Sequence, residues 1–450
     1  MKFIKKITET QLFKISSLNS LSVILKIGVG LVTSKLLAVF VGPGGMALVG
    51  NLRNFMTSLE SISTLGFQNG IVKYVAETQT KNEFSPNEKW VPENPNLNTF
   101  SEESEKDQSE LQKIMATVFI SLLFVAMLLS GGLFFLATYF SSHIFGNSWD
   151  FSVVFKVLAL ALPWYAVSLF FVSVINGLGQ FKKVIWITIL GNAIGLLVSL
   201  VLIWNYKTLG ALLAIVVTPA LLFFVTFYFI NKEISVFKAI RLQYFDFKII
   251  KNLSSYSLMA LVSSVLGPLV LLEIRKNVIA SVGLDAAGYW ETITRISSYY
   301  MLFASTILSV YFLPKLANAK NNGETKTVFW SYYKSILPLF IVGLTMIYFL
   351  RFFIVELLFT KEFLPVASMF FWQLVGDILK VTFLILGYQL FAKKLTLAFI
   401  ISEIASLAVL YFLSNYLILF FGIQGVLIAQ VLDNLIYLLV LVVYFRKSLF

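Results

Sequence analysis

The sequence has no cysteine and a single histidine, His143, among its 450 residues. The absence of cysteine excludes disulfide bonds and thiolate metal sites, and His143 is predicted to be an exposed loop residue. No G-x-x-x-x-G-K-[ST] motif and no Gly-Lys dipeptide occur, which excludes a P-loop ATPase. The aspartates never form D-x-D, a pattern common in metal-dependent glycosyltransferases. No catalytic constellation and no cofactor site is predicted.

Charge is also scarce: 13% of the residues are charged and 58% are hydrophobic, with a mean hydropathy of +0.85. Twelve apolar runs are long enough to cross a bilayer, which needs about 20 residues in a helix. Each run must be helical, because every backbone polar group needs a partner within its own segment. The sequence therefore predicts an all-α integral membrane protein with about twelve transmembrane helices. The predicted spans are 15–41, 47–68, 114–140, 152–176, 184–204, 209–230, 253–280, 286–313, 327–350, 366–391, 395–415 and 422–445.

Basic residues outside the spans predict the orientation. With a cytoplasmic N-terminus, 23 Lys and Arg lie in cytoplasmic segments and three in the loops on the other side. Both termini are therefore predicted to be cytoplasmic. The net charge of +12 follows mostly from this topology, so no nucleic-acid partner is predicted.

The segment 231–252 divides the spans into lobes of six helices each, 1–230 and 253–450. Its alternating apolar and basic residues are typical either of a helix on the membrane surface or of a plain cytoplasmic linker. An offset of 241 residues aligns Lys35 with Lys276 and Gly42 with Gly283, as a parallel internal repeat does.

The segment 83–110 is the only long polar stretch. It contains eight acidic residues, two lysines and three prolines. This composition cannot bury a core, so we predict a disordered insertion in a cytoplasmic loop.

Several cations lie inside the predicted spans. A charge at mid-membrane costs about 2.5–3.5 kcal/mol on insertion scales, so such residues usually face a cavity and mark a functional site. Lys26, Arg295 and Lys380 are the most deeply placed. Four others lie near a span end, where the side chain can also reach the interface: Lys35, Arg53, Arg275 and Lys276.

Acids partly offset these cations. Glu291 and Arg295, spaced i,i+4, share a helix face, as do Gln373, Asp377 and Lys380. A structural ion pair between Asp377 and Lys380 is the simpler interpretation of the second group. The spans nevertheless hold nine cations and six acids. A cavity with this lining attracts an anionic group, and phosphate or pyrophosphate fits better than an organic cation.

Three blocks of the sequence resemble the Wzx-type flippases, the O-antigen and enterobacterial-common-antigen translocases of the multidrug/oligosaccharidyl-lipid/polysaccharide exporter superfamily. The similar spacing extends over nearly the whole chain, apart from 83–110. The blocks are Lys26 to Gly28 with Lys35 to Val39, Gly42-Pro43, Asn51, Arg53 and Asn69 to Ala76; Ser309 to Pro314; and Trp372 to Val381 with Gly387-Tyr388.

The resemblance implies two six-helix lobes around a central cavity and transport by alternating access. The implied cargo is an undecaprenyl-pyrophosphate-linked oligosaccharide, moved from the cytoplasmic to the periplasmic leaflet of a bacterial inner membrane. A glycan polymerase would act downstream, as in lipopolysaccharide synthesis. We expect pyrophosphate to bind Lys26, Lys35, Arg53, Lys276, Arg295 and Lys380, sugars to bind Asn51, Asn69 and Gln373, and Glu60, Glu291 or Asp377 to couple transport to protons or ions.

Two other functions remain open. A proton- or sodium-coupled multidrug antiporter of the same superfamily is expected to place acids deep in the first span, where this chain has Lys26 and Lys35. A membrane glycan polymerase or ligase needs a periplasmic site, yet the predicted periplasmic loops are short.

Overall fold

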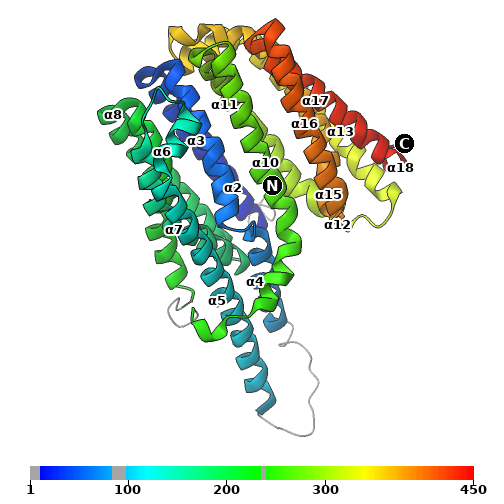
Figure 1. Ribbon diagram of the computed structural model, residues 1–450. Coiled ribbons are helices and arrows are strands. Elements are labelled where there is room, and N and C mark those ends of the chain that lie inside the picture. Colours follow the sequence, from blue (N-terminus) through cyan, green and yellow to red (C-terminus); the bar gives the residue numbers. More distant parts are fainter. Residues whose placement is uncertain (1–10, 84–97, 235–239) are drawn as a thin grey trace, which may run out of the picture. The chain divides into compact units, whose positions relative to one another are not determined.

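The computed structural model describes residues 11–83, 98–234 and 240–450, and every regular element in these ranges is helical (Figure 1). Ten of the described helices are long and apolar enough to span a membrane. One of them, α8 (Phe181–Asn231), contains two predicted spans joined at a kink where Lys207 has a φ of +49°. A further predicted span lies in α3 (Gly42–Ser63), whose Arg53 and Glu60 make it less apolar. The predicted all-helical membrane protein is confirmed.

The helices pack into two compact units. The first comprises residues 1–29, 59–202 and 212–261, and the second comprises 30–58, 203–211 and 262–450. Both α2 (Gln11–Phe40) and α3 cross from one unit to the other. The bounds of these two compact units differ from those of the predicted lobes, 1–230 and 253–450. The lobe bounds stay a prediction.

The first unit contains α4, α5, α6, α7 and most of α8. In it, α5 and α7 lie side by side (Figure 1). Its core is built from buried aromatic and branched side chains, among them Phe170, Phe171 and Val174 of α7. The bounds are α4 (Gln68–Glu83), α5 (Asn98–Phe135), α6 (Ala137–Phe145) and α7 (Ser152–Gly177).

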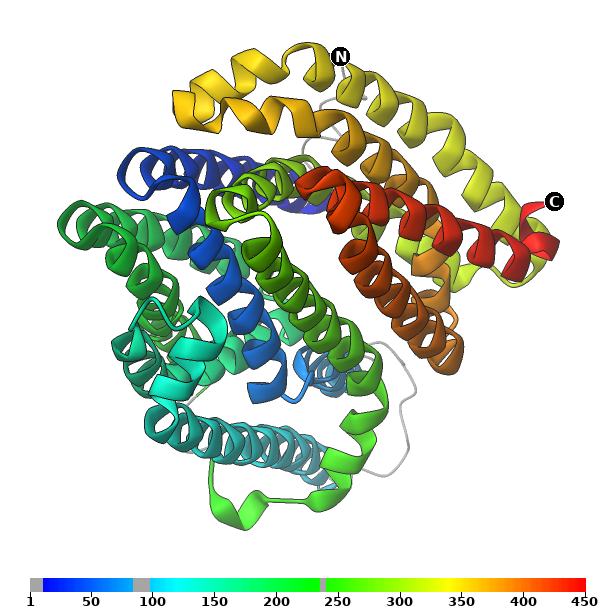
Figure 2. The same cartoon turned by 45° about the horizontal axis from the view of Figure 1, so that its top comes forward.

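The second unit contains most of α3 and all helices after α10, and in it α15, α16 and α17 pack together (Figure 2). A π-helical turn, η2, interrupts the run from α11 to α12 just before Pro314, which has no amide hydrogen for the regular ladder. The segment η1 (Leu242–Tyr244) belongs to the first unit, and α10 (Phe247–Ser281) crosses from the first unit to the second. The bounds of the other elements are α11 (Leu284–Ile307), η2 (Leu308–Phe312), α12 (Leu313–Asn318), α13 (Asn322–Phe349), α14 (Arg351–Leu358), η3 (Lys361–Met369), α15 (Phe370–Ala392), α16 (Thr396–Phe421), α17 (Ile423–Tyr444) and α18 (Arg446–Leu449).

Two polar segments differ in part from their predictions. Residues 98–110, predicted to be disordered, form the start of α5, because a helix extends readily from an existing one through Glu, Gln, Ser and Lys. The predicted insertion otherwise falls on 84–97, outside the described residues. In the segment 231–252, residues 240–246 contain only the short η1, so this part is a linker rather than a surface helix.

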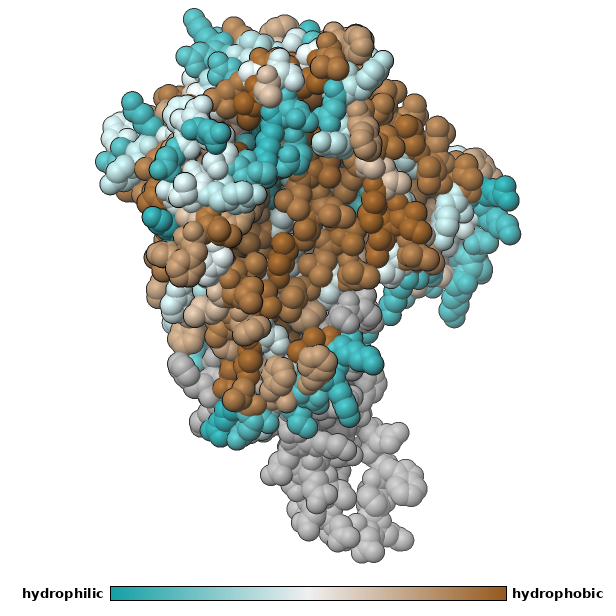
Figure 3. Space-filling view, in the orientation of Figure 1, coloured by the Kyte–Doolittle hydropathy of each residue, from teal (hydrophilic) through white to brown (hydrophobic). Residues whose placement is uncertain are grey.

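Large apolar side chains are exposed in both units (brown in Figure 3). Phe135 of α5 is 85% exposed and Leu419 of α16 is 73% exposed. Surfaces of this kind are stable when lipid covers them, in agreement with a multi-pass membrane protein.

Within the second unit, α3 and α11 approach each other through glycine. A Cβ atom on Gly288 would collide with the carbonyl oxygen of Pro43, so only glycine permits this contact. The glycines that the 241-residue offset aligns, Gly42 and Gly283, have φ of +72° and +116°. Gly42 is the first residue of α3, and Gly283 directly precedes α11. The internal repeat stays a prediction.

Candidate functional site

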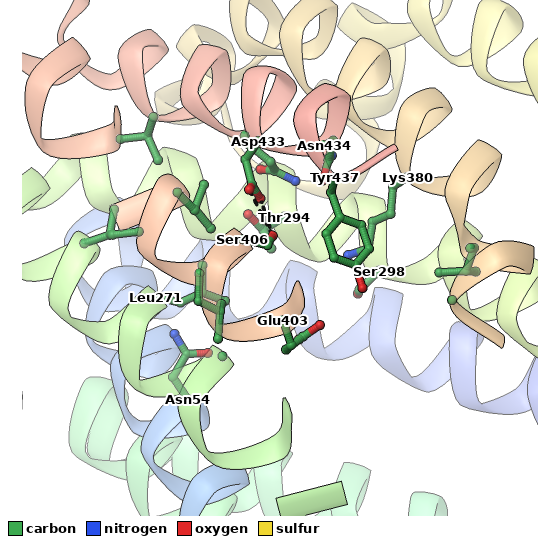
Figure 4. Close-up of a pocket in the computed structure, with 18 of the residues that line it drawn as sticks. Asn54, Leu271, Thr294, Ser298, Lys380, Glu403, Ser406, Asp433, Asn434 and Tyr437 are labelled. Carbon is green, nitrogen blue, oxygen red and sulfur yellow. Dashed lines mark hydrogen bonds between the residues drawn. The ribbon is translucent and has the colours of Figure 1, made fainter. Parts of the chain in front are cut away.

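A cavity of about 530 Å³ lies within the second unit, where α3, α10, α11, α15, α16 and α17 supply its lining (Figure 4). Seven charged residues line it. The cations are Arg53, Arg275, Arg295 and Lys380, and the carboxylates are Glu291, Glu403 and Asp433. Charged side chains within membrane-spanning helices are costly and usually mark a functional site. This cavity is therefore the candidate site.

Glu291 of α11 holds two of the arginines. Its Oε2 lies 2.8 Å from Arg275 Nη2, and its Oε1 lies 3.6 Å from Arg295 Nη2. All three side chains are more than 90% buried. The guanidinium of Arg275 also lies over the Trp290 ring, 5.1 Å from its centroid. The predicted shared face of Glu291 and Arg295 is confirmed, and Arg275 of α10 joins them.

Neutral groups complete the environment of the two buried arginines. Arg275 Nη1 donates to Asn51 Oδ1 over 3.5 Å, a long contact. Arg295 Nη1 donates to Ser34 Oγ over 3.4 Å. Gly50 makes room for this network, because a Cβ there would collide with the carboxylate of Glu291. The network thus depends on a small residue in α3.

Several donors around the cavity lack an acceptor in the described part of the chain. They are Asn54 Nδ2, Arg275 Nε, Trp290 Nε1, and Nε and Nη2 of Arg295, of which only Nη2 has a longer ionic contact with Glu291. Arg53 is exposed and lines the same cavity, and its guanidinium forms no hydrogen bond or ion pair with the described residues. A buried donor without an acceptor costs about 1–3 kcal/mol. Three arginines with one glutamate therefore favour a ligand that supplies only acceptors and negative charge. We call Arg53, Arg275, Glu291 and Arg295 the arginine wall.

The helices α16 and α17 line the cavity with a different set of groups, Glu403, Ser406, Gln430, Asp433 and Tyr437, which we call the carboxylate wall. Ser406 Oγ donates to both carboxylate oxygens of Asp433, at 2.9 and 3.1 Å (Figure 4).

Lys380 of α15 also lines the cavity and interacts electrostatically with Glu403 and Asp433. It forms no close ion pair with any described residue. Its charge is therefore only partly compensated by the protein.

Three predicted pyrophosphate ligands, Arg53, Arg295 and Lys380, line this one cavity. Lys276 does not line it: its Nζ lies 2.8 Å from Glu273 Oε1, whereas the neighbouring Arg275 faces the cavity.

Lys35 binds elsewhere in the second unit. Its Nζ donates to the carbonyl oxygens of Leu357 and Phe359, at 3.0 and 2.5 Å. A cation is favourable at a helix C-terminus, where carbonyl groups lack intrahelical partners. Lys35 therefore stabilises the end of α14.

Asp377 is fully buried between α11 and α15. It accepts hydrogen bonds from Ser297 Oγ at 2.7 Å, Tyr300 OH at 2.5 Å and Gln373 Nε2 at 3.2 Å. Asp377 and Lys380 form no close ion pair in the described structure, although they interact electrostatically, and the hydrogen bonds of Asp377 come from hydroxyl and amide donors of two helices. Gln373 Oε1 has no partner among the described residues, and Asn51 makes the long contact with Arg275. The predicted sugar-binding roles of both residues stay predictions.

The remaining candidates lie in the first unit. Lys26 of α2 and Asn69 of α4 are exposed. Glu60 accepts a hydrogen bond from Tyr165 OH at 2.5 Å and a weaker one from Gln68 Nε2 at 3.4 Å. Their predicted roles stay predictions.

Sequence reasoning gave no role to Arg275, Glu403 or Asp433, although each lies within a predicted span. An ionisable residue in a span was the available signal. The face that each residue presents depends on packing between helices, which the sequence does not display.

The chain is similar to known membrane transport proteins. It is 28% identical over 428 residues to the "Lipid III flippase" of Escherichia coli (strain K12), covering 95% of this chain and 96% of that protein. Among solved structures, an inward-facing multidrug resistance MATE family transporter of the MOP superfamily matches with a TM-score of 0.71, at 15% identity, covering 95% of this chain and 98% of that one. The lipid II flippase MurJ matches with a TM-score of 0.62, at 16% identity, covering 96% and 87%.

The similarity to these solved structures confirms the predicted fold. The family model described as "Polysaccharide biosynthesis protein" matches residues 103–368, more than half of the chain. The chain belongs to the polysaccharide biosynthesis protein family.

Proposed function

We propose that this protein moves an undecaprenyl-pyrophosphate-linked oligosaccharide from the cytoplasmic to the periplasmic leaflet of a bacterial inner membrane by alternating access. The observation that supports it most is the arginine wall, in which Nε of Arg275 and Nε of Arg295 lack acceptors within the described residues. Its relative in Escherichia coli is named a lipid III flippase, which supports the same class of cargo.

Pyrophosphate supplies the hydrogen-bond acceptors and the negative charge that the arginine wall lacks. Its oxygens only accept hydrogen bonds, and guanidinium groups bind phosphate through paired N–H donors. Low-dielectric surroundings strengthen the attraction. In this proposal Arg53 and Arg295 contact the diphosphate, and Lys380 contributes charge from α15.

The size of the cavity suits a head group. A volume of about 530 Å³ falls in the range of about 300–1,000 Å³ that is typical of small-ligand sites. In this proposal the long undecaprenyl chain stays in the hydrocarbon of the bilayer, so the protein does not have to bind it inside the cavity. Asp377 and Glu60 remain proposed sites for proton or ion coupling, and Lys26 a proposed further contact for the anionic head group.

The test is translocation of a fluorescent undecaprenyl-pyrophosphate oligosaccharide in proteoliposomes. Arg53→Gln removes one charge-assisted contact, worth about 1.5–3 kcal/mol, so we expect flipping at subsaturating substrate to fall at least tenfold. Lys334→Gln is the matched control, because this exposed lysine lies in a span of the same unit and does not line the cavity.

Fast flipping by the wild type that Arg53→Gln slows and Lys334→Gln preserves supports the proposal. If the wild type flips no substrate, with or without a proton or sodium gradient, the proposal is wrong and the multidrug antiporter replaces it. Equal rates for all three proteins keep a flippase and exclude the arginine wall as its site.

A further inference from the structure

The proposed function assigns no role to the carboxylate wall, although it lines the same cavity. We propose that it is the subsite that recognises the first sugars of the glycan, through Glu403, Gln430 and Asp433 with Tyr437. This inference rests on the proposed function and assigns the two ends of the head group to different helices.

The wall has unused hydrogen-bonding capacity. Glu403 and Gln430 are half-buried, and neither side chain forms a hydrogen bond with the described residues. Asp433 is buried and has Ser406 as its donor. Carboxylates accept and amides both donate and accept, so together they match sugar hydroxyls, which do both. A ligand that displaces water from the cavity has to supply partners for these groups, because burying them unpaired is costly, and sugar hydroxyls can do so.

Aromatic rings supply the apolar part of the subsite. Tyr437 packs edge-on against Phe383, with ring centroids 4.8 Å apart, and Phe391 contacts Phe399 at 4.6 Å. All four rings line the cavity. Small-ligand sites typically combine such rings with a few polar groups that set orientation, and a pyranose offers apolar C–H faces together with hydroxyls.

The charges of the two walls indicate which end of the head group each wall binds. A diphosphate is repelled by the carboxylates of Glu403 and Asp433, whereas the arginine wall attracts it. The neutral sugars are therefore left to the carboxylate wall. Lys380 limits the negative potential there through its interaction with both acids.

The carboxylate wall is also held in place before any ligand binds. Asn434 Nδ2 donates to the carbonyl oxygen of Gly376 over 2.9 Å, which fixes α17 against α15. A Cβ on Gly425 would collide with the carbonyl oxygen of Leu417, so the turn between α16 and α17 is tightly packed. A preorganised wall binds with a smaller loss of side-chain entropy.

The test compares two probes in nanodiscs, undecaprenyl pyrophosphate and the same lipid carrying a trisaccharide of the host's own glycan. We expect the wild type to bind the trisaccharide lipid more tightly. Glu403→Gln and Gln430→Ala should each reduce this preference about tenfold, the usual effect of one lost hydrogen bond with a charged or well-placed partner. The affinity for the bare lipid should stay within about twofold of the wild type. Glu356→Gln, an exposed acid of the same unit, is the matched control.

Arg53→Gln separates this inference from the proposed function, because it should weaken both probes equally. Equal affinities of the wild type for the two probes, with Arg53→Gln still weakening both, overturn the glycan subsite and leave the flippase. Failure of the wild type to bind either probe overturns the proposed function itself. A further outcome is that the Glu403→Gln variant loses affinity for both probes, and only in buffer that contains sodium in place of choline. That result would make the carboxylate wall an ion site and would also overturn the glycan subsite.

Discussion

Replacing Glu291 by glutamine removes the negative charge between two buried arginines without changing the shape of the side chain. Glu291 lies 2.8 Å from Arg275 and 3.6 Å from Arg295, and the side chains are 9%, 3% and 3% exposed. Removing one partner of a buried ion pair costs about 3–5 kcal/mol, because the other charge stays buried and uncompensated. We expect the unliganded Glu291→Gln protein to lose stability of this order.

A bound diphosphate should restore part of that stability, because it replaces the missing negative charge. A ligand at one hundred times its Kd adds about 2.7 kcal/mol, and we expect a larger gain in Glu291→Gln than in the wild type. The assay is thermal unfolding in detergent with and without undecaprenyl pyrophosphate, followed by tryptophan fluorescence. Glu273→Gln is the control in the adjacent helix: its pair with Lys276 is 47% and 23% exposed, so its loss should cost less than about 1 kcal/mol. Equal loss in both variants, or no extra gain from the lipid in Glu291→Gln, would refute the reasoning.

Two further predictions concern packing in the second unit. Gly288→Ala forces a Cβ onto the carbonyl of Pro43 and should lower the unfolding temperature by several degrees. Gly343→Ala is the control, because Gly343 has open space around it and its substitution should not lower that temperature. Equal melting curves for the two variants would contradict the close approach of α3 and α11. Tyr300→Phe removes a donor from buried Asp377 and should cost about 1–3 kcal/mol of unfolding free energy, which denaturant titration in detergent measures; a cost near zero would show that this hydrogen bond does not stabilise the fold.

The sequence was most informative about which segments are helices in the membrane, because a bilayer leaves an apolar run no other backbone structure. Charge and depth predicted Arg295 and Lys380, and charge together with the family resemblance predicted Arg53; all three line the cavity. The same reasoning did not distinguish Arg275 from Lys276, because adjacent residues on a helix point about 100° apart and packing decides which one faces the cavity.

Contacts between residues that lie far apart in the sequence could not be predicted either. The helical spacing of Gln373 and Asp377 correctly indicates one face, but the donors Ser297 and Tyr300 come from α11, far away in sequence. Depth in the membrane likewise gave no sign that Lys35 binds carbonyl groups of α14. Contacts of this kind depend on which helices become neighbours, and no local pattern encodes them.

The central claim is that the arginine wall binds the diphosphate of a lipid-linked glycan, and an electron cryomicroscopy map of the protein with undecaprenyl-pyrophosphate oligosaccharide tests it most directly. The account predicts phosphate density within hydrogen-bond distance of Arg53 and Arg295. Phosphate density beside Lys26, with the arginine wall empty, would contradict it.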